Sequence, residues 1–524
     1  MGNPHRMRDS YYITTAIYYA NAPLHVGHAF EIIGADVMAR YQRLCGKDVL
    51  FLTGLDEHGE KIQRAADKRG ITPQALVDQL AEDFRAICRD LAISNDDLIR
   101  TTETRHKEVV EAFWRKVREK GDIYLGAYEG LYCLRDEAYV KEGDLKDGAC
   151  PSCGAKPEKL SEPAYFFRLS AYQDRLKQYY ARHHELVQPS FRRTEMLRML
   201  EAGLEDVCIS RSTIRWGIPV PDVTGHVVYV WFDALVNYVS APGWPADPDK
   251  FSRYWPADMH IVGKDILRWH ALLWPAMLMA ADMPLPKAMF GHGFFYISGS
   301  KMSKSLGNVV DPRAVAAKYG AEPLRYFLMR EVPFENDGHY SEEGLVERIN
   351  SELANELGNL LHRTLSMTEQ YFKGAIPAPD PADRVLADEA EAVCRDVPPL
   401  MDQLQFSRAL ERTWDLVRRA NRFVEEREPW KLAKDPAAAP RLASTMYQLA
   451  ESLRLVAALV EPFMPTKAAA MRTQLGLDPV ALKLADELRW GVLKPGTATK
   501  KGDPLFPRIE TPKPAKERTA DGRT

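Results

Sequence analysis

The sequence feature that most constrains the fold is a strand-then-helix pattern that runs through the first part of the chain, stops, and later resumes. Residues 11–17, YYITTAI, are β-branched and aromatic, as expected of a buried strand, and apolar residues then recur at helical spacing from Phe30 to Leu44. After a long interruption, the strand-like MHIVGKD leads into the helical ILRWHALLWPAMLMAA. This alternation predicts an α/β domain with an open, mostly parallel sheet, whose ligands bind beyond the carboxyl ends of the strands.

The interruption and the C-terminal part have different patterns. Aromatic-rich short strands and loops replace the earlier rhythm, which predicts an inserted domain, and the later residues have helical periodicity with one turn-rich break at GAIPAPDPAD. The predicted domains are residues 1–118 and 226–344 for the two halves of the sheet domain, 119–225 for the insertion, 345–505 for a helical bundle and 506–524 for a polar tail.

Length and composition exclude several classes of protein. With 524 residues, the chain is too long for one hydrophobic core, and its net charge of −3 gives no overall attraction to polyanions, so a contact with nucleic acid must be local. The longest apolar stretch is too short to cross a bilayer, and the first residues lack the apolar core of a signal peptide. The seven scattered cysteines suit a reducing compartment. We therefore expect a cytoplasmic protein without a membrane partner.

Two histidines precede the first predicted helix. His25 and His28 flank Gly27 where backbone N–H groups and the helix dipole favour an anion, and the missing side chain of Gly27 lets a phosphate or a flat ring approach closely. The alternative is that both histidines only cap the helix or lie on the surface. The pattern alone leaves both interpretations open.

A glycine- and serine-rich loop, SGSKMSKSLGN at residues 298–308, follows the apolar strand GFFYI. Lys301 and Lys304 in such a loop can close over a pyrophosphate leaving group and neutralise charge that develops in the transition state. For an isolated pair of lysines, a solvated surface loop is the ordinary alternative. The phosphate-binding interpretation of the loop is favoured by its combination with the two histidines.

HVGH after the first strand and KMSKS after the last strand of one sheet form the paired signature of the class I aminoacyl-tRNA synthetases. Within that class the chain resembles the methionyl-tRNA synthetases over nearly its whole length, through TTAIYYANAPLHVGH, FLTGLDEHGEKI, YVWFDALVNYVS, HIVGKDILRWHALLWPAML, KMSKSLGN and EPWKLAK. The resemblance implies a Rossmann-type nucleotide-binding parallel sheet, split by an inserted connective domain and followed by an all-α anticodon-binding bundle. It also implies a ligase that activates methionine with ATP and transfers it to tRNA(Met), both initiator and elongator.

The resemblance assigns roles to single residues. Catalysis falls to His25, His28, Lys301 and Lys304. The residues that bind ATP, which arrives with Mg²⁺, would be Asn21, His25, Gly27, His28, Glu31, Gly263, Asp265 and Lys304. Methionine needs an acid for its ammonium group and polarisable apolar walls for its thioether. The residues that bind it would be Ile17, Tyr19, Asp56, Trp231, Ala234, Leu235, Tyr238, Ile266, His270 and Trp274. By pattern alone, these aromatic residues are typical of a hydrophobic core, and His270 and Trp274 lie four apart on one helical face. Asp265 could cap the following helix instead of binding a ribose.

CPSCG, with Cys150 and Cys153, has the shape of half a zinc site. The matching stretch YCLRD supplies Cys133 and Asp136, so these four residues could hold Zn²⁺. Some members of the family have lost this metal, and an aspartate in place of a cysteine could mark such a loss. We expect zinc, because the CxxC motif in a small domain otherwise has no explanation.

The resemblance assigns anticodon recognition to Asn359, Arg363, Pro429 and Trp430. Asn359 and Arg363 lie four apart on one predicted helix face, and Trp430 follows a helix break where an indole can stack on a base. The alternative is that Trp430 seals the core of the bundle. Longer members of the family carry an appended dimerising domain, and the residues after 500 are too few for one, so we expect a monomer that needs no protein partner.

Four competing interpretations remain at this point. The isoleucyl, valyl and leucyl enzymes share both signatures but carry a much larger insertion. Cysteinyl enzymes bind zinc through a cysteine near the first signature, and AIYYANAPLHVGH contains none. A nucleotidylyltransferase for small molecules would leave the helical bundle without a role. A catalytically inactive RNA-binding relative is opposed by the intact histidines and lysines.

Overall fold

The computed structural model describes residues 9–510 apart from residues 22, 136–137, 141, 152, 213, 298–299, 302–308 and 481–482. The chain divides into two compact units. The first unit contains residues 1–339 and 401–407, and the second contains residues 340–400 and 408–524.

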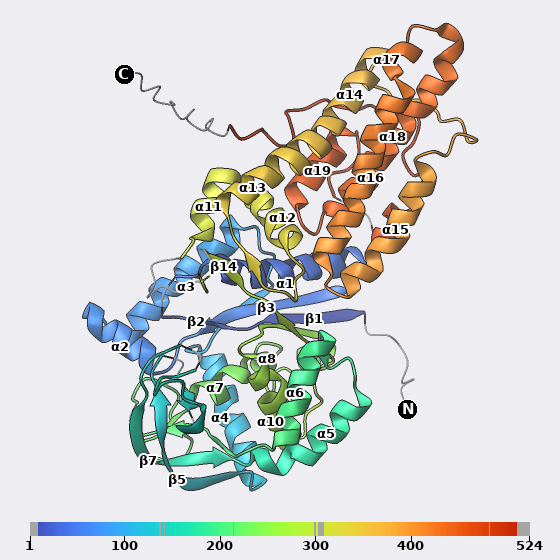
Figure 1. Cartoon of the computed structure of the whole chain (residues 1–524). Coiled ribbons are helices and arrows are strands. Elements are labelled where there is room, and N and C mark those ends of the chain that lie inside the picture. The colour runs from blue at the N-terminus through green and yellow to red at the C-terminus, as the bar shows by residue number, and fades with distance from the viewer. Residues whose placement is uncertain are drawn as a thin grey trace, which may run out of the picture. The chain divides into compact units, whose positions relative to one another are not determined.

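The first unit is built on one parallel sheet (Figure 1). Its strands are β1 (Ser10–Thr15), β2 (Tyr18–Tyr19), β3 (Asp48–Asp56), β4 (Asp97–Arg100), β8 (Val187–Gln188), β12 (Met259–Gly263) and β13 (Met289–His292). They lie in the order β2-β3-β1-β12-β13-β8, with β4 also paired to β3. Ile13 of β1 lies opposite both Phe51 of β3 and Met259 of β12, so the two separated halves of the sequence meet at the centre of the sheet. The α/β fold with a parallel sheet is confirmed.

Helices cover both faces of this sheet. Their bounds are α1 (Val26–Leu44), α2 (Glu60–Arg69), α3 (Pro73–Asp90), α4 (Thr104–Glu119), α7 (Val230–Leu235), α8 (Asn237–Ser240), α9 (Pro248–Tyr254), η3 (Trp269–Leu273), α10 (Trp274–Ala280), α11 (Pro312–Tyr319) and α12 (Ala321–Glu331). In Figure 1, α1 and α12 lie on one side of β1 and β3, and α4, α7, α8 and α10 lie on the other. In helix α1, the predicted apolar residues Phe30, Ile33, Val37 and Tyr41 are buried, but so is every residue from 29 to 39, so α1 is a central helix enclosed on all sides and not an amphipathic surface helix.

A smaller antiparallel sheet lies within the predicted insertion. Its strands are β5 (Ile123–Cys133), β6 (Ala138–Val140), β7 (Glu158–Phe167) and β9 (Val207–Cys208), in the order β6-β5-β7-β9. Helices α5 (Gln173–Arg182) and α6 (Ser190–Ala202) and the strand pair β10 (Ser210–Arg211) and β11 (Val227–Val228) follow. Strand β8, also inside the range 119–225, pairs in parallel with β13, so this part of the chain contributes a strand to the large sheet.

A three-stranded sheet forms around the end of the first unit, from β14 (Phe295–Ile297), β15 (Ser300–Lys301) and β16 (Gly338–His339). In the described part of the second unit, the regular elements are helices, as predicted, apart from one isolated β-bridge. Its helices are α13 (Glu342–Arg348), η5 (Ile349–Gly358), α14 (Asn359–Phe372), α15 (Ala387–Asp402), α16 (Phe406–Arg427), α17 (Pro429–Leu432), α18 (Ala439–Val460), α19 (Pro465–Gln474) and α20 (Leu484–Glu487). Helices α15 and α16 pass through residues 401–407, which cluster with the first unit.

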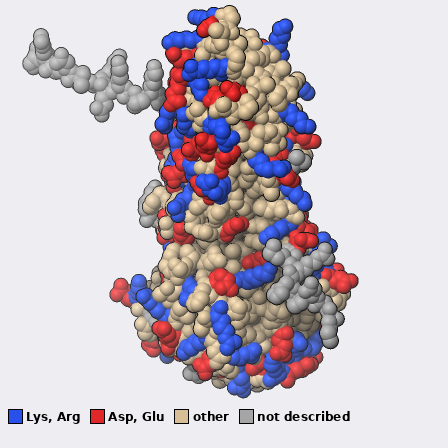
Figure 2. All heavy atoms as spheres, turned by 90° about the vertical axis from the view of Figure 1, so that its right-hand side faces the viewer, with Lys and Arg blue, Asp and Glu red and all other residues tan. Residues whose placement is uncertain are grey.

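The core of the second unit contains a buried charge network beside its apolar residues. Arg454 of α18 pairs with Glu451 at 2.8 Å and with Glu487 at 2.9 Å, and all three side chains are buried. Among the described residues, no helix is long and apolar enough to span a membrane. On the face drawn in Figure 2, basic and acidic side chains are interspersed, in keeping with the small net charge of −3.

Candidate active site

A cavity of about 390 Å³ lies at the carboxyl ends of the strands of the large sheet. Of the residues predicted to bind substrates, the cavity is lined by Ile17, Tyr19, His25, Gly27, His28, Glu31, Asp56, Trp231, Ala234, Leu235, Tyr238, Gly263, Asp265, Ile266 and His270. Predicted sites for ATP and for methionine thus share one cavity. Asn21 and Trp274 do not line it, and Lys304 and the side chain of Lys301 lie outside the described residues.

His25 and His28 both cap α1 and line the cavity. His25 Nδ1 accepts a hydrogen bond from the Gly27 N–H at 3.1 Å, and His28 Nδ1 accepts one from the His25 N–H at 3.1 Å. A neutral imidazole that accepts at Nδ1 carries its proton on Nε2. Each ring therefore offers an Nε2–H donor to an anionic ligand at a helix N-terminus, so the capping and phosphate interpretations are compatible.

The end of the cavity predicted to take the amino acid is lined by aromatic rings, of which Tyr238 and His270 are buried and Trp231 is half-buried. The His270 Nδ1–H donates to the Ile266 carbonyl at 3.0 Å, so Nε2 accepts the hydroxyl proton of Tyr238 at 2.8 Å. Burial lowers the pKa of His270 from 6.5 to about 4, which keeps the ring neutral near pH 7. Trp231 stacks on Trp269 with a centroid distance of 4.9 Å. The result is an apolar recess with one fixed polar pair, which suits an unbranched thioether.

Asp56 is the acidic group at this end of the cavity. It is the last residue of β3, lies in register with Tyr19 of β2, and is buried although it borders the cavity. A carboxylate in a cavity wall can accept charge-assisted hydrogen bonds from a cationic ligand. Asp56 can therefore hold an ammonium group of the ligand.

The end of the cavity predicted to take ATP contains a second buried acid, Glu31. Glu31 Oε2 lies 2.7 Å from Nε2 of His292, and the Nδ1–H of His292 donates to the Gly293 carbonyl at 2.7 Å. Nδ1 of His292 already carries a proton. The short contact between Nε2 of His292 and Oε2 of Glu31 therefore needs a second proton, which lies between these two atoms. A Cβ on Gly263 would lie 2.9 Å from Asp265 Oδ1, so a larger residue there would displace this carboxylate. Asp265 is exposed at the cavity and can accept hydrogen bonds from a ribose.

Several lining residues were missed by the sequence analysis. They include Tyr18, Lys61, Arg135, Asn237, His292, Phe294 and Phe295. His292 ends β13, so the rule that ligands bind at the carboxyl ends of parallel strands could have identified it. Arg135 comes from the antiparallel sheet, and no spacing in the sequence relates it to the cavity.

Trp274 packs behind the cavity wall. Its ring lies 6.0 Å from Tyr238 and 6.1 Å from Trp255, and the side chain is fully buried. The predicted i, i+4 relation with His270 assumed an α-helix, but Trp269–Leu273 forms a π-helix. The rings of both residues still lie close to Tyr238, with centroid distances of 5.7 Å for His270 and 6.0 Å for Trp274, but His270 lines the cavity and Trp274 does not.

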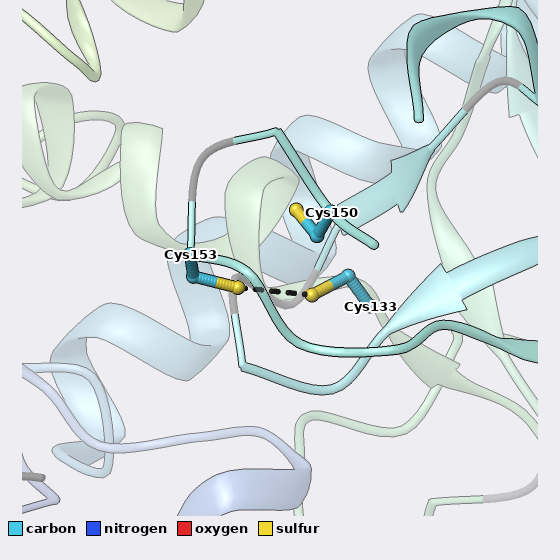
Figure 3. A group of neighbouring side chains, drawn as sticks. All are labelled: Cys133, Cys150 and Cys153. Carbon is cyan, nitrogen blue, oxygen red and sulfur yellow. Dashed lines mark hydrogen bonds between the residues drawn. The ribbon is translucent and has the colours of Figure 1, made fainter. Parts of the chain in front are cut away.

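Three of the four predicted metal ligands converge in the antiparallel sheet. The thiols of Cys133, Cys150 and Cys153 lie within 4.8 Å of one another, and those of Cys133 and Cys153 are 3.4 Å apart (Figure 3). The Gly154 N–H donates to the Cys150 carbonyl at 2.8 Å, with Gly154 at a φ of +72°, which closes a tight knuckle. Three convergent thiols fit a tetrahedral soft ion. The predicted fourth ligand, Asp136, lies outside the described residues.

The residues predicted to read the anticodon lie in the second unit. Asn359 begins α14 and is exposed, and Arg363 pairs with Glu425 of α16 at 2.8 Å. Pro429 and Trp430 begin α17, directly after α16 and a left-handed residue at Glu428 with a φ of +46°. Trp430 is half-buried rather than sealed in the core.

Comparisons with known proteins agree with this geometry. The family described as "tRNA synthetases class I (M)" matches residues 11–162 and 140–365, and the "Anticodon binding domain of methionyl tRNA ligase" matches residues 375–519. A methionine–tRNA ligase of Caldanaerobacter subterraneus is 50% identical over 97% of the chain and 80% of that protein. The methionine–tRNA ligase of Bacillus subtilis is 47% identical over 96% of the chain and 78% of that protein.

The fold agrees with a solved structure as well. The chain is similar to methionyl-tRNA synthetase of Mycobacterium tuberculosis in complex with methionyl-adenylate, with a TM-score of 0.92 and 43% identity. The match covers 96% of this chain and 100% of that one. The sequence, the fold and the cavity together show that the chain belongs to the methionyl-tRNA synthetases, a family of class I aminoacyl-tRNA synthetases.

Proposed function

We propose that the protein is a methionine–tRNA ligase that acts in two steps. The methionine carboxylate attacks the α-phosphorus of ATP, the bond to the β-phosphate breaks, and methionyl-adenylate and pyrophosphate form. A hydroxyl of the terminal ribose of tRNA(Met), initiator or elongator, then attacks the activated carbonyl and AMP leaves. The observation that carries the proposal is a single cavity with a buried acid and aromatic walls at one end and two imidazoles at a helix N-terminus at the other.

The residues of the cavity support a mechanism based on positioning and charge stabilisation. Asp56 holds the ammonium group while the recess around Tyr238 and His270 takes the thioether. This orients the carboxylate toward the nucleotide end, where the Nε2–H groups of His25 and His28 meet the phosphates. Lys301 and Lys304 are proposed to neutralise the leaving pyrophosphate. No protein nucleophile is needed.

Two metal ions belong to the proposal. Mg²⁺ arrives with ATP and offsets charge on the phosphates. Zn²⁺ is held by Cys133, Cys150 and Cys153, with Asp136 as the proposed fourth ligand. The thiol convergence supports a structural metal, because a small antiparallel sheet gains stability from such a crosslink.

Metal analysis tests the zinc site. Protein purified without chelator should contain one zinc per chain, and Cys150→Ser should remove it and lower the melting temperature. Cys88→Ser is the matched control, because Cys88 is also buried but lies on α3 outside the cluster. A wild-type protein without zinc, or a Cys150→Ser variant that keeps it, would refute the site.

The helical unit is proposed to bind the anticodon through Asn359, Arg363, Pro429 and Trp430. The half-exposed indole of Trp430 is available for stacking on a base, a contact of about 1–3 kcal/mol. Trp430→Ala should lower tRNA charging about tenfold and leave methionine-dependent pyrophosphate exchange unchanged. Trp490→Ala removes another half-buried tryptophan of the same unit and serves as the control. Equal losses in both assays would count against the assignment.

The function itself is tested by pyrophosphate exchange with each of the twenty amino acids, followed by charging of tRNA(Met). Exchange that depends on methionine, together with charging, supports the proposal. Exchange with another amino acid, or adenylate chemistry without tRNA charging, would overturn it. We further propose a monomer that acts in the cytoplasm, where unoxidised thiols only 3.4 Å apart are maintained.

A further inference from the structure

A buried carboxylate lies directly behind the amino-acid end of the cavity. Asp233 is 0% exposed and lies on α7 between Trp231 and Ala234, both of which line the cavity. Its Oδ2 accepts a hydrogen bond from His58 Nδ1 at 2.7 Å, and its Oδ1 accepts one from His106 Nε2 at 2.8 Å. The three side chains are buried and none of them lines the cavity.

These two hydrogen bonds join three elements that are far apart in the sequence. His58 follows the end of β3, only two residues after Asp56, and His106 lies on α4. The backbone carbonyl of His58 also accepts a hydrogen bond from the Tyr19 hydroxyl at 2.9 Å. His58 is therefore hydrogen-bonded through its ring to α7 and through its backbone carbonyl to Tyr19, which lines the cavity.

The energetics of the cluster fix its geometry. Burial would raise the pKa of Asp233, but the charges and hydrogen bonds of His58 and His106 hold that pKa below its usual value, so the group is a carboxylate. A buried carboxylate that loses one hydrogen-bond partner keeps its desolvation cost without the interaction that offsets it. Nδ1 of His106 also lies 2.9 Å from Ser240 Oγ, which fixes the orientation of that ring. The cluster therefore has one favourable arrangement.

We propose that Asp233, through His58 and His106, is a positioning residue that sets the spacing between Asp56 and the apolar wall of Trp231 and Ala234. This spacing is the length into which an amino acid must fit between its ammonium group and the end of its side chain. The cluster thereby helps the enzyme to select methionine over amino acids that differ by one carbon. This inference rests on the proposed function, because it takes methionine as the ligand of the cavity.

The physical reason is that an apolar pocket discriminates weakly against one methylene, by about 10- to 200-fold. Such a small margin survives only if both ends of the pocket are rigid, since a wall that yields can accommodate a longer side chain. Asp56 and Trp231 lie on different elements, β3 and α7. The His58–Asp233 hydrogen bond ties the loop after β3 directly to α7.

The first test is Asp233→Asn, which keeps the shape but replaces one accepting oxygen with a donor. In pyrophosphate exchange, the KM for methionine should rise about tenfold while the KM for ATP changes by less than about twofold. The preference for methionine over ethionine, which is one carbon longer, should fall about fivefold. Asp258→Asn is the matched control: Asp258 accepts from the Tyr12 N–H at 2.8 Å at the opposite, amino-terminal end of β12.

A second pair of variants separates positioning from folding. The amide nitrogen of a glutamine can replace His106 Nε2 as a donor, and a leucine cannot. His106→Gln should therefore retain most of the preference for methionine over ethionine, and His106→Leu should lose it about fivefold. His58→Asn and His58→Leu form the corresponding pair, because an asparagine amide can replace Nδ1. These pairs carry the test if Asp233→Asn fails to fold.

The outcomes distinguish the two proposals. A wild-type protein without methionine-dependent exchange overturns the proposed function. A wild-type protein that is active, with variants that change the KM values for methionine and ATP equally, overturns the positioning role. So does a preference for methionine over ethionine that is the same in the glutamine and leucine variants of His106.

Discussion

The two ends of the cavity differ in how their side chains are held. At the amino-acid end, Tyr238 is 1% exposed and His270 is 2% exposed, and each is hydrogen-bonded within the protein. At the nucleotide end, His25 and His28 are half-buried and Asp265 is exposed. Tyr238 and His270 are thus fixed by packing, whereas His25, His28 and Asp265 face solvent in front of the buried Glu31–His292 pair.

The difference follows from the two ligands. A thioether offers little charge, so its recognition depends on the shape of a desolvated recess. A triphosphate carries several charges that can be matched by N–H donors even at a partly open site, and pyrophosphate must leave after each reaction. We therefore expect substitutions at the nucleotide end to change the rate and substitutions at the amino-acid end to change methionine affinity.

The largest expected effect is at the nucleotide end. His28→Ala should lower kcat of pyrophosphate exchange by about 10³-fold, because a donor to the developing charge is lost, and should leave the Kd for methionine unchanged. Exchange kinetics and equilibrium methionine binding measure the two quantities. His184→Ala, which removes an exposed histidine after α5, is the control. A parallel loss of methionine affinity would break the contrast between the two ends.

The next effect is at the acid of the amino-acid end. Asp56→Asn should weaken methionine binding about 100-fold, because the ammonium group would be buried without its counter-charge. The KM for ATP should change little. Binding of methioninol, which has the ammonium but no carboxylate, should weaken as much as binding of methionine. If methioninol binding is unaffected, Asp56 does not hold the ammonium group.

The pH dependence of stability sharpens the description of the buried end. Burial holds the pKa of His270 at about 4 in the folded protein, below its value of about 6.5 when unfolded. The unfolded state therefore binds more protons between these values, and the free energy of unfolding should fall by about 2 kcal/mol as the pH drops from 6.5 to 4.

His270→Gln should make that decrease smaller, as measured by urea denaturation at several pH values. The decrease should not vanish, because burial also lowers the pKa of His260. An unchanged pH profile in the glutamine variant would show that His270 titrates normally and that this end of the cavity is hydrated.

The smallest expected effect concerns the exposed acid of the nucleotide end. Asp265→Asn should raise the KM for ATP about tenfold, because one acceptor for a ribose hydroxyl is lost, and should leave the KM for methionine unchanged. Exchange with 2′-deoxyATP in place of ATP should reduce the difference between wild type and variant. An equal difference with both nucleotides would argue that Asp265 does not contact that hydroxyl.

The sequence by itself determined the features that depend on neighbours along the chain. Apolar residues at helical spacing predicted helix α1, and His25, Gly27 and His28 mark its N-terminus because capping is a local interaction. The strand-and-helix alternation likewise predicted the parallel sheet, since each element must bury its own apolar face. The resemblance then supplied most of the cavity lining.

Only the tertiary structure decided which distant side chains meet. His58 and Asp233 are 175 positions apart, and Glu31 and His292 are 261 positions apart, yet each pair forms a short buried contact. Arg135 reaches the cavity from the inserted sheet, and Trp274 packs against Tyr238 without lining the cavity. Periodicity shows which face of an element is buried, but a long-range partner is chosen by the packing of the whole domain, which no local spacing encodes.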